Sequence, residues 1–78
     1  MAQLRLLGPA REAAGVSAAD VPGARVIDVL HEARSRFGPK FGEVLDRSQV
    51  WLNGEPVAPD TPIGVTDELA VLPPVSGG

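Results

Sequence analysis

The residue types best suited to chemistry stand at the end of the chain, in Leu72-Pro-Pro-Val-Ser-Gly-Gly78. The two prolines end a strand and favour an extended backbone, whereas the glycines have no Cβ atoms and can enter a narrow slot. The four residues from Val75 to Gly78 span at most about 13 Å, at about 3.3 Å each. We therefore predict a flexible tail, residues 74–78, that presents the Gly78 carboxylate in another protein's active site while its other residues thread the entrance: Pro74, Val75, Ser76 and Gly77.

Side chains that catalyse reactions or bind metals are scarce elsewhere. The chain has no cysteine or tyrosine and a single histidine, His31, which cannot assemble a zinc site alone. Neither a GxxxxGK[ST] nor a GxGxxG phosphate-binding motif is present. Asp60, Asp67 and Glu68 fall at turns, where capping of the backbone is favoured over acid–base chemistry. We predict no catalytic residue, no metal site and no bound cofactor, and we expect His31 on the solvated side of a helix.

The composition limits the possible partners and locations. With 78 residues, of which 44% are hydrophobic, the chain makes one small domain at most, and no apolar run approaches the roughly 20 residues that span a bilayer. The net charge of −3, without a cluster of lysine or arginine, argues against nucleic acid. The first residues run directly into an alternating pattern rather than a signal peptide. We expect a soluble, cytoplasmic protein that binds neither membrane nor nucleic acid.

The periodicity of apolar residues predicts the elements that would hold such a tail. Leu4 and Leu6 alternate with polar residues as in a half-buried strand, and Leu7 then faces the other side. Helical spacing of apolar residues predicts a main helix over 26–37, ended by Gly38-Pro39. The remaining predictions are a short helix over 9–14, a strand over 16–21, a helical turn or two over 40–45, strands over 50–52 and 55–57 joined by an Asn53-Gly54 type I′ turn, and a last strand over 68–72.

These elements predict an α+β fold over residues 1–73, with one main helix across one face of a four- to five-stranded sheet and the other face open. If the first, last and third strands are neighbours, Leu7, Leu72 and Trp51 point to the open face together with Arg5 and Ala70. We predict that this apolar patch, with Arg11 beside it, is an interface for a partner protein. The alternative is that loops partly cover Trp51, which then only stabilises a thin core.

Several stretches along the whole chain resemble one family. The sequence is similar to the MoaD/ThiS family of ubiquitin-like sulfur carriers, and within it to the small subunit of molybdopterin synthase, in Arg5–Gly15, Asn53-Gly54-Glu55, Thr61-Pro62-Ile63, Asp67-Glu-Leu69 and Leu72–Gly78. The resemblance implies a mixed β-grasp sheet in which the first and last strands are parallel neighbours. It also places Arg25 where the family commonly has a threonine helix cap, and the Arg25 side chain cannot accept that hydrogen bond.

The resemblance also implies a role for Gly78. An ATP-dependent activating enzyme of the E1 type would join Gly78 to AMP, and a sulfur donor would convert the glycyl adenylate into a thiocarboxylate, 1-thioglycine. The tail would then deliver sulfur to a pterin in the large subunit of molybdopterin synthase, within an expected heterotetramer whose active site lies on that large subunit. The chain itself would be a non-catalytic sulfur carrier.

Other functions stay open from the sequence alone. The same chemistry could serve the synthesis of thiamin, cysteine or thiolated RNA. From a different class, the chain could be a ubiquitin-like modifier that is joined through Gly78 to lysines, or a β-grasp module that only binds other proteins. A pair of glycines is a weak motif by itself, and it could also end a frayed tail by chance.

Overall fold

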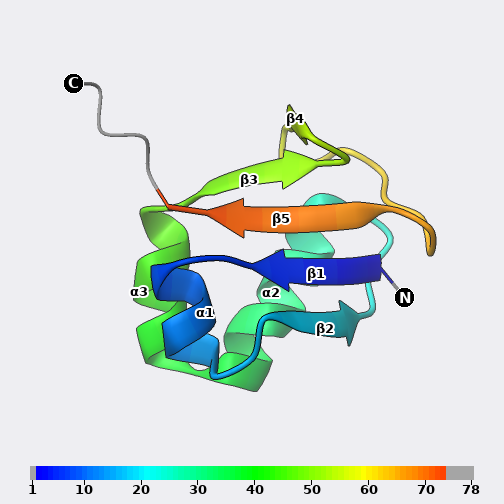
Figure 1. Cartoon of the computed structure of the whole chain (residues 1–78). Coiled ribbons are helices and arrows are strands. Elements are labelled where there is room, and N and C mark those ends of the chain that lie inside the picture. The colour runs from blue at the N-terminus through cyan, green and yellow to red at the C-terminus, as the bar shows by residue number, and fades with distance from the viewer. Residues whose placement is uncertain (1, 74–78) are drawn as a thin grey trace.

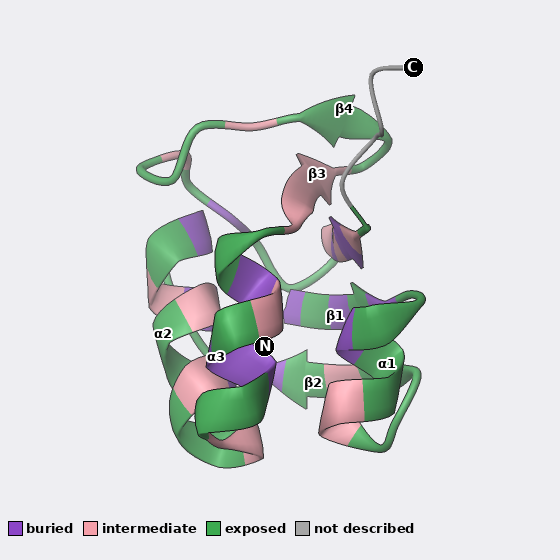
Figure 2. Ribbon diagram, turned by 90° about the vertical axis from the view of Figure 1, so that its left-hand side faces the viewer, coloured by how far each residue is buried: buried purple, intermediate pink, exposed green. Residues whose placement is uncertain are grey.

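In the computed structural model, which describes residues 2–73, burial alternates along the first strand. The side chains of Ala2, Leu4 and Leu6 in β1 (Ala2–Leu6) are at most 2% exposed, whereas Gln3 and Arg5 between them are exposed. Figure 2 shows this alternation of buried and exposed residues along β1. Leu69 and Val71 are likewise buried in β5 (Glu68–Leu72). The predicted inward side of both strands is confirmed.

The two strands lie side by side and parallel at the centre of a five-stranded mixed sheet (Figure 1). The strand order is β2-β1-β5-β3-β4, and every other neighbouring pair is antiparallel. The bounds of the other strands are β2 (Ala18–Val21), β3 (Gln49–Leu52) and β4 (Glu55–Pro56). This arrangement confirms the predicted α+β, ubiquitin-like β-grasp fold.

The helical layer contains the predicted main helix, the predicted short helix over 9–14 and a third helix where a helical turn or two was predicted. It contains α1 (Pro9–Ala14), α2 (Val26–Phe37) and α3 (Pro39–Asp46), and α3 packs against both other helices. Figure 1 shows α2 and α3 on one side of the sheet, with α1 at the end where β1 and β5 finish. The helix α3 confirms the predicted helical turn or two over 40–45 and is one residue longer at each end, because Pro39 occupies its first turn and Phe41 and Leu45 are buried on one face.

Helix α2 begins at Val26, as predicted, although Arg25 supplies no side-chain acceptor. Its N-terminus is capped from within the helix, because the Arg25 backbone N–H donates to Asp28 Oδ2 at 3.1 Å. At the other end, Arg34 joins α2 to α3 by donating to the Gly42 carbonyl at 3.1 Å and pairing with Asp46. None of the helices within residues 2–73 is long and apolar enough to cross a membrane.

Three strand boundaries differ from the prediction, and the smallest difference is that β3 starts at Gln49 rather than Val50. Strand β2 starts at Ala18 rather than Val16, because Gly15 ends α1 with a φ of 80° and the chain bends through Val16, which is 42% exposed. Strand β4 ends at Pro56 rather than Val57. The Asn53-Gly54 turn is as predicted, since both residues have the positive φ of a type I′ hairpin, 50° and 87°.

The core fills the space between the sheet and the helices. The buried side chains come from the inward side of β1, β2 and β5, from all three helices, and from the loop that precedes β5. The largest of them are Phe41, Leu4, Leu69, Val21, Val26, Val29 and Val71. No comparable layer of helices covers the other face of the sheet within residues 2–73 (Figure 1), so that face carries the candidate site.

Candidate functional site

The predicted tail follows Pro73, at the end of β5. We call Leu72 and Pro73, with Leu7 and Gly8 beside them, the root of the tail. The Leu7 N–H donates to the Val71 carbonyl at 3.2 Å, so β1 and β5 stay paired up to the end of β5. Gly8 then turns the chain with a φ of 57°, which favours glycine, and Pro73 lies against it, since a Cβ on Gly8 would be 3.6 Å from the Pro73 Cγ. The predicted tail residues Pro74, Val75, Ser76, Gly77 and Gly78 lie outside the described residues.

Beside this root, the strand registers arrange the outward side chains in rows. Residues directly opposite each other in neighbouring strands share a face. One row crosses the whole sheet and contains, in order, Ala18, Arg5, Ala70, Trp51 and Pro56. A second row, nearer the root, contains Leu72 and Gln49. We call this surface, together with Leu7, the outer face.

Three of the four predicted interface residues come together on the outer face. Leu7 follows the inward-facing Leu6 and is 40% exposed, whereas Leu72 and Trp51 are half-buried. The Trp51 Nε1 donates to Gln49 Oε1 at 3.1 Å, and Pro56 lies opposite Trp51 in the register. Trp51 is therefore tied down by its own neighbours and still contributes apolar surface to the same face as Leu72.

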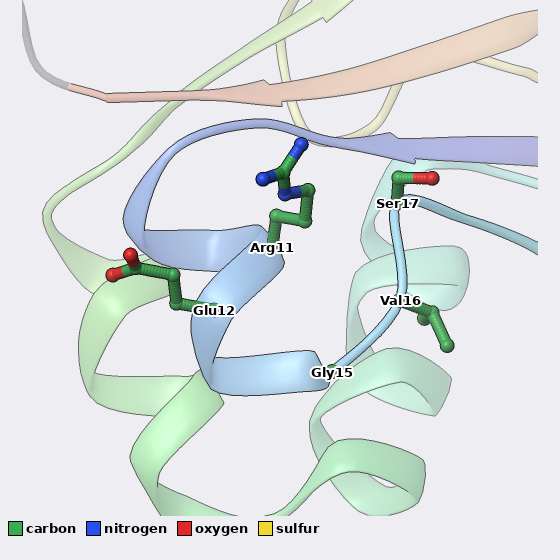
Figure 3. Close-up of a pocket in the computed structure, with 5 residues that line it drawn as sticks. All are labelled: Arg11, Glu12, Gly15, Val16 and Ser17. Atoms are coloured by element: carbon green, nitrogen blue, oxygen red, sulfur yellow. The ribbon is translucent and has the colours of Figure 1, made fainter.

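Arg11 lies on α1 rather than on a strand of the sheet. It is exposed on α1 and lines a shallow, open hollow of ≈ 290 Å³ with Glu12, Gly15, Val16 and Ser17 (Figure 3). The structure does not place Arg11 in the cross-strand rows of the outer face.

An ion pair stands in the middle of the outer face, and the sequence analysis did not predict it. The Arg5 Nε lies 3.2 Å from Glu68 Oε2, and their side chains are 57% and 44% exposed. In the parallel register, Arg5 is opposite Ala70 and Gln3 is opposite Glu68, so the pair is diagonal across β1 and β5. The charges of Arg5 and Glu68 are visible in the sequence, but their proximity follows only once the parallel register is known.

The charged groups at the far end of β5 have a structural role. Asp67 accepts from the Gly64 N–H through Oδ2 at 2.7 Å and from Asn53 Nδ2 through Oδ1 at 3.0 Å, and these two bonds lower the pKa of its carboxyl. The Glu68 N–H donates to Asn53 Oδ1 at 2.9 Å. Asp67 therefore caps a turn and ties the hairpin between β3 and β4 to the start of β5, as the preference for capping predicts.

The described residues offer little other chemistry. Between residues 2 and 73 there is no group of three or more His, Asp or Glu side chains that could hold a metal ion. His31 is exposed on α2, as predicted for a solvated histidine. The candidate site is therefore the outer face and the root of the tail rather than a catalytic pocket.

Comparison with known proteins agrees with this arrangement. A model of the ThiS family matches residues 4–78. Small archaeal modifier protein 1 of Methanosarcina acetivorans is similar in structure, with a TM-score of 0.87 and 27% identity over 99% of this chain and 95% of that one. The corresponding protein of Haloferax volcanii gives a TM-score of 0.78 and 33% identity over 97% of each chain.

A third similar structure is a putative molybdopterin converting factor, subunit 1, from Pyrococcus furiosus. It gives a TM-score of 0.80 and 29% identity over 95% of this chain and 97% of that chain. All three proteins match at least 95% of the length of this chain, and the family model extends to residue 78.

Proposed function

The chain belongs to the ThiS family of ubiquitin-like sulfur carriers and modifiers, and we propose that it carries sulfur as a thiocarboxylate on Gly78 for molybdopterin synthesis. Members of this family are small carrier proteins that are generally not catalysts. In this proposal the chain is the small subunit of a cytoplasmic molybdopterin synthase, within a heterotetramer whose large subunit contains the active site.

One observation carries the proposal: the apolar outer face reaches the root of the tail. Leu72 is the last residue of β5, and Leu7 leaves β1 beside it, hydrogen-bonded to Val71. A protein that covers Leu7, Leu72 and Trp51 would therefore bind at the point from which residues 74–78 depart. Docking and delivery of Gly78 would use one continuous surface.

The chemistry assigned to Gly78 follows from the weakness of a carboxylate as an electrophile. An activating enzyme would let a Gly78 carboxylate oxygen attack the α-phosphate of ATP, with pyrophosphate as the leaving group. A sulfur donor would then attack the acyl carbon and displace AMP. The resulting 1-thioglycine is ionised at neutral pH and nucleophilic, so it can give its sulfur to a pterin held by the large subunit.

Two features favour molybdopterin synthesis over the other sulfur pathways. The Pro73-Pro74-Val75-Ser76-Gly77-Gly78 ending is typical of the molybdopterin carriers, whereas thiamin carriers usually keep the glycines without the double proline. The similarity to the Pyrococcus furiosus protein, named as a putative molybdopterin converting factor subunit, supports the same choice. Carriers for thiamin, cysteine or thiolated RNA remain the nearest alternatives.

A protein modifier is the second candidate. Two proteins named small archaeal modifier protein 1 are 27% and 33% identical to this chain over nearly its whole length. In that case the same Gly78 adenylate would be transferred to a lysine amine, which would form an isopeptide bond instead of a thiocarboxylate.

The intact mass of the chain separates a sulfur carrier from a protein modifier. The chain is incubated with ATP, a sulfur donor and the activating enzyme of the same organism, with and without a cell extract. Replacement of one oxygen by sulfur supports a carrier, and a covalent adduct with other proteins through lysine supports a modifier. An unchanged mass in both samples contradicts both functions.

A further inference from the structure

The outer face has one feature that an apolar docking surface does not need: a guanidinium near its centre. Arg5 lies in the row that crosses all five strands, and its neighbours in that row are Ala18 and Ala70. Both alanines are short, and 57% of the Arg5 side chain is exposed. The guanidinium therefore stands above the surrounding surface, on the same face as Trp51 and Leu72.

The fold uses only part of the hydrogen-bonding capacity of Arg5. A guanidinium has five N–H donors, one on Nε and four on the two terminal nitrogens. The Nε pairs with Glu68 at 3.2 Å, whereas the terminal nitrogens make no hydrogen bond with any residue between 2 and 73.

Two other arginines differ from Arg5, because their terminal nitrogens donate hydrogen bonds within the fold. Arg34 uses a terminal nitrogen to donate to the Gly42 carbonyl at 3.1 Å, and Arg36 donates in the same way to the Asp20 carbonyl at 3.0 Å. Both therefore hold elements of the fold together. Among residues 2–73, Arg5 pairs only with the exposed Glu68 carboxylate, through Nε, so the described part of the fold does not use its terminal nitrogens.

A partner that covers Trp51 and Leu72 would also remove Arg5 from water. Buried charged donors without acceptors cost far more than the apolar contacts around them gain, so the covering surface has to supply acceptors. Backbone carbonyls could accept single bonds, but a carboxylate matches the paired N–H groups of a guanidinium and also its charge. The position opposite Arg5 is therefore selective for an acidic side chain.

We propose that Arg5 is a specificity-determining residue. Its two terminal nitrogens would bind an Asp or Glu carboxylate of the partner protein while its Nε stays paired with Glu68. This inference rests on the proposed function, because it takes the outer face as the docking surface. It adds the chemistry of the partner: an apolar surface for Trp51 and Leu72 that contains one acidic residue facing β1. Proteins with similar apolar surfaces but no such carboxylate would be rejected.

The test measures binding of the chain to the molybdopterin synthase large subunit of the same organism, by calorimetry at low and high salt. Arg5→Leu removes all the donors, and we expect at least about a 30-fold loss of affinity together with a weaker dependence on salt. Arg5→Lys keeps the charge but not the paired donors, and we expect an intermediate loss. Arg47→Leu removes an exposed arginine from the end of α3 and is the matched control, with affinity within about twofold of the unmodified chain.

Thermal unfolding of all three variants verifies that the fold is intact, and the mass of the product on Gly78 verifies activation. Equal affinity and equal salt dependence for Arg5→Leu and the unmodified chain would overturn the inference while leaving the sulfur-carrier proposal in place. Absence of binding by the unmodified chain, or of sulfur on Gly78, would contradict the proposed function itself. A loss for Arg5→Leu that Arg5→Lys partly restores supports the partner carboxylate.

Discussion

The two faces of the same sheet differ in composition and in use. On the inner face, Leu4, Leu69 and Val71 are completely buried against the helices. On the outer face, the residues that alternate with them are partly or largely exposed and include an ion pair, Arg5 with Glu68. Strands β1 and β5 therefore supply residues to the core and to the outer face in turn.

This difference shows how a chain of 78 residues can have both a core and the docking surface that we propose. Because side chains in a strand alternate with a period of two, a slip of one residue would exchange the two faces. The inner face determines whether the domain folds. The outer face can change with less effect on stability, and so it is the part that can be adapted to a particular partner.

The largest expected effect is on stability, and it comes from comparing two leucines of β5 that lie on opposite faces of the sheet, Leu69 and Leu72. Leu69→Ala removes a fully buried side chain, and we expect it to lower the free energy of unfolding by about 3 kcal/mol. Leu72→Ala changes a half-buried residue on the other face, and we expect a loss of less than about 1 kcal/mol. Urea unfolding of the two variants measures both values. Similar losses would contradict the claim that the inner face contributes more to stability than the outer face.

Charge on the outer face gives the next effect. Leu72→Asp or Leu7→Asp would place an unpaired carboxylate under the partner, and we expect at least about a 30-fold loss of affinity for the large subunit. Val65→Asp is the matched control, because Val65 is 73% exposed in the loop before β5, at the opposite end of that strand from Leu72. If Val65→Asp weakens binding as much as Leu72→Asp does, the outer face is not the docking surface.

The smallest effect concerns the polar junction at the far end of β5. Hydrogen bonds from Gly64 and Asn53 lower the pKa of Asp67 in the folded state. The stability that they provide is therefore present above the pKa of the unfolded chain, about 3.9, and is lost as the pH falls through the folded value.

Replacement of Asp67 by Asn tests this sign. We expect the urea midpoint of the unmodified chain to fall more between about pH 5 and about pH 2 than that of Asp67→Asn, because the amide does not titrate. Partner binding near neutral pH should be equal for both chains. An identical pH dependence of the two midpoints would contradict the role of Asp67 in the fold.

Much of the fold could be predicted from the sequence because its patterns are local. Alternation fixed the inward side of β1 and β5, and helical spacing from Val26 to Phe37 gave α2. The prediction for α3 was short by one residue at each end, because Gly38-Pro39 interrupts the pattern and leaves a window of only eight residues. The start of β2 was placed too early, since the exposed Val16 extends an alternating pattern past the turn at Gly15.

The candidate site was predictable in part for the same reason. Strand phase alone placed Leu72 and Trp51 on one face, and the structure brings them together. The pair of Arg5 and Glu68 depends on the parallel register of β1 and β5, which no local pattern encodes. Arg11, which was also predicted to belong to the interface, lies on α1 with Val16 and Ser17 around one hollow, and its part in binding stays a prediction.

The most direct test of the sulfur-carrier account is the intact mass of the chain after reaction with ATP, a sulfur donor and the activating enzyme, compared with a variant that lacks Gly78. The account predicts that one oxygen is replaced by sulfur in the unmodified chain and that the variant keeps its original mass while unfolding at the same temperature. The same sulfur gain in the variant, or no gain in the unmodified chain, would contradict the assignment of Gly78.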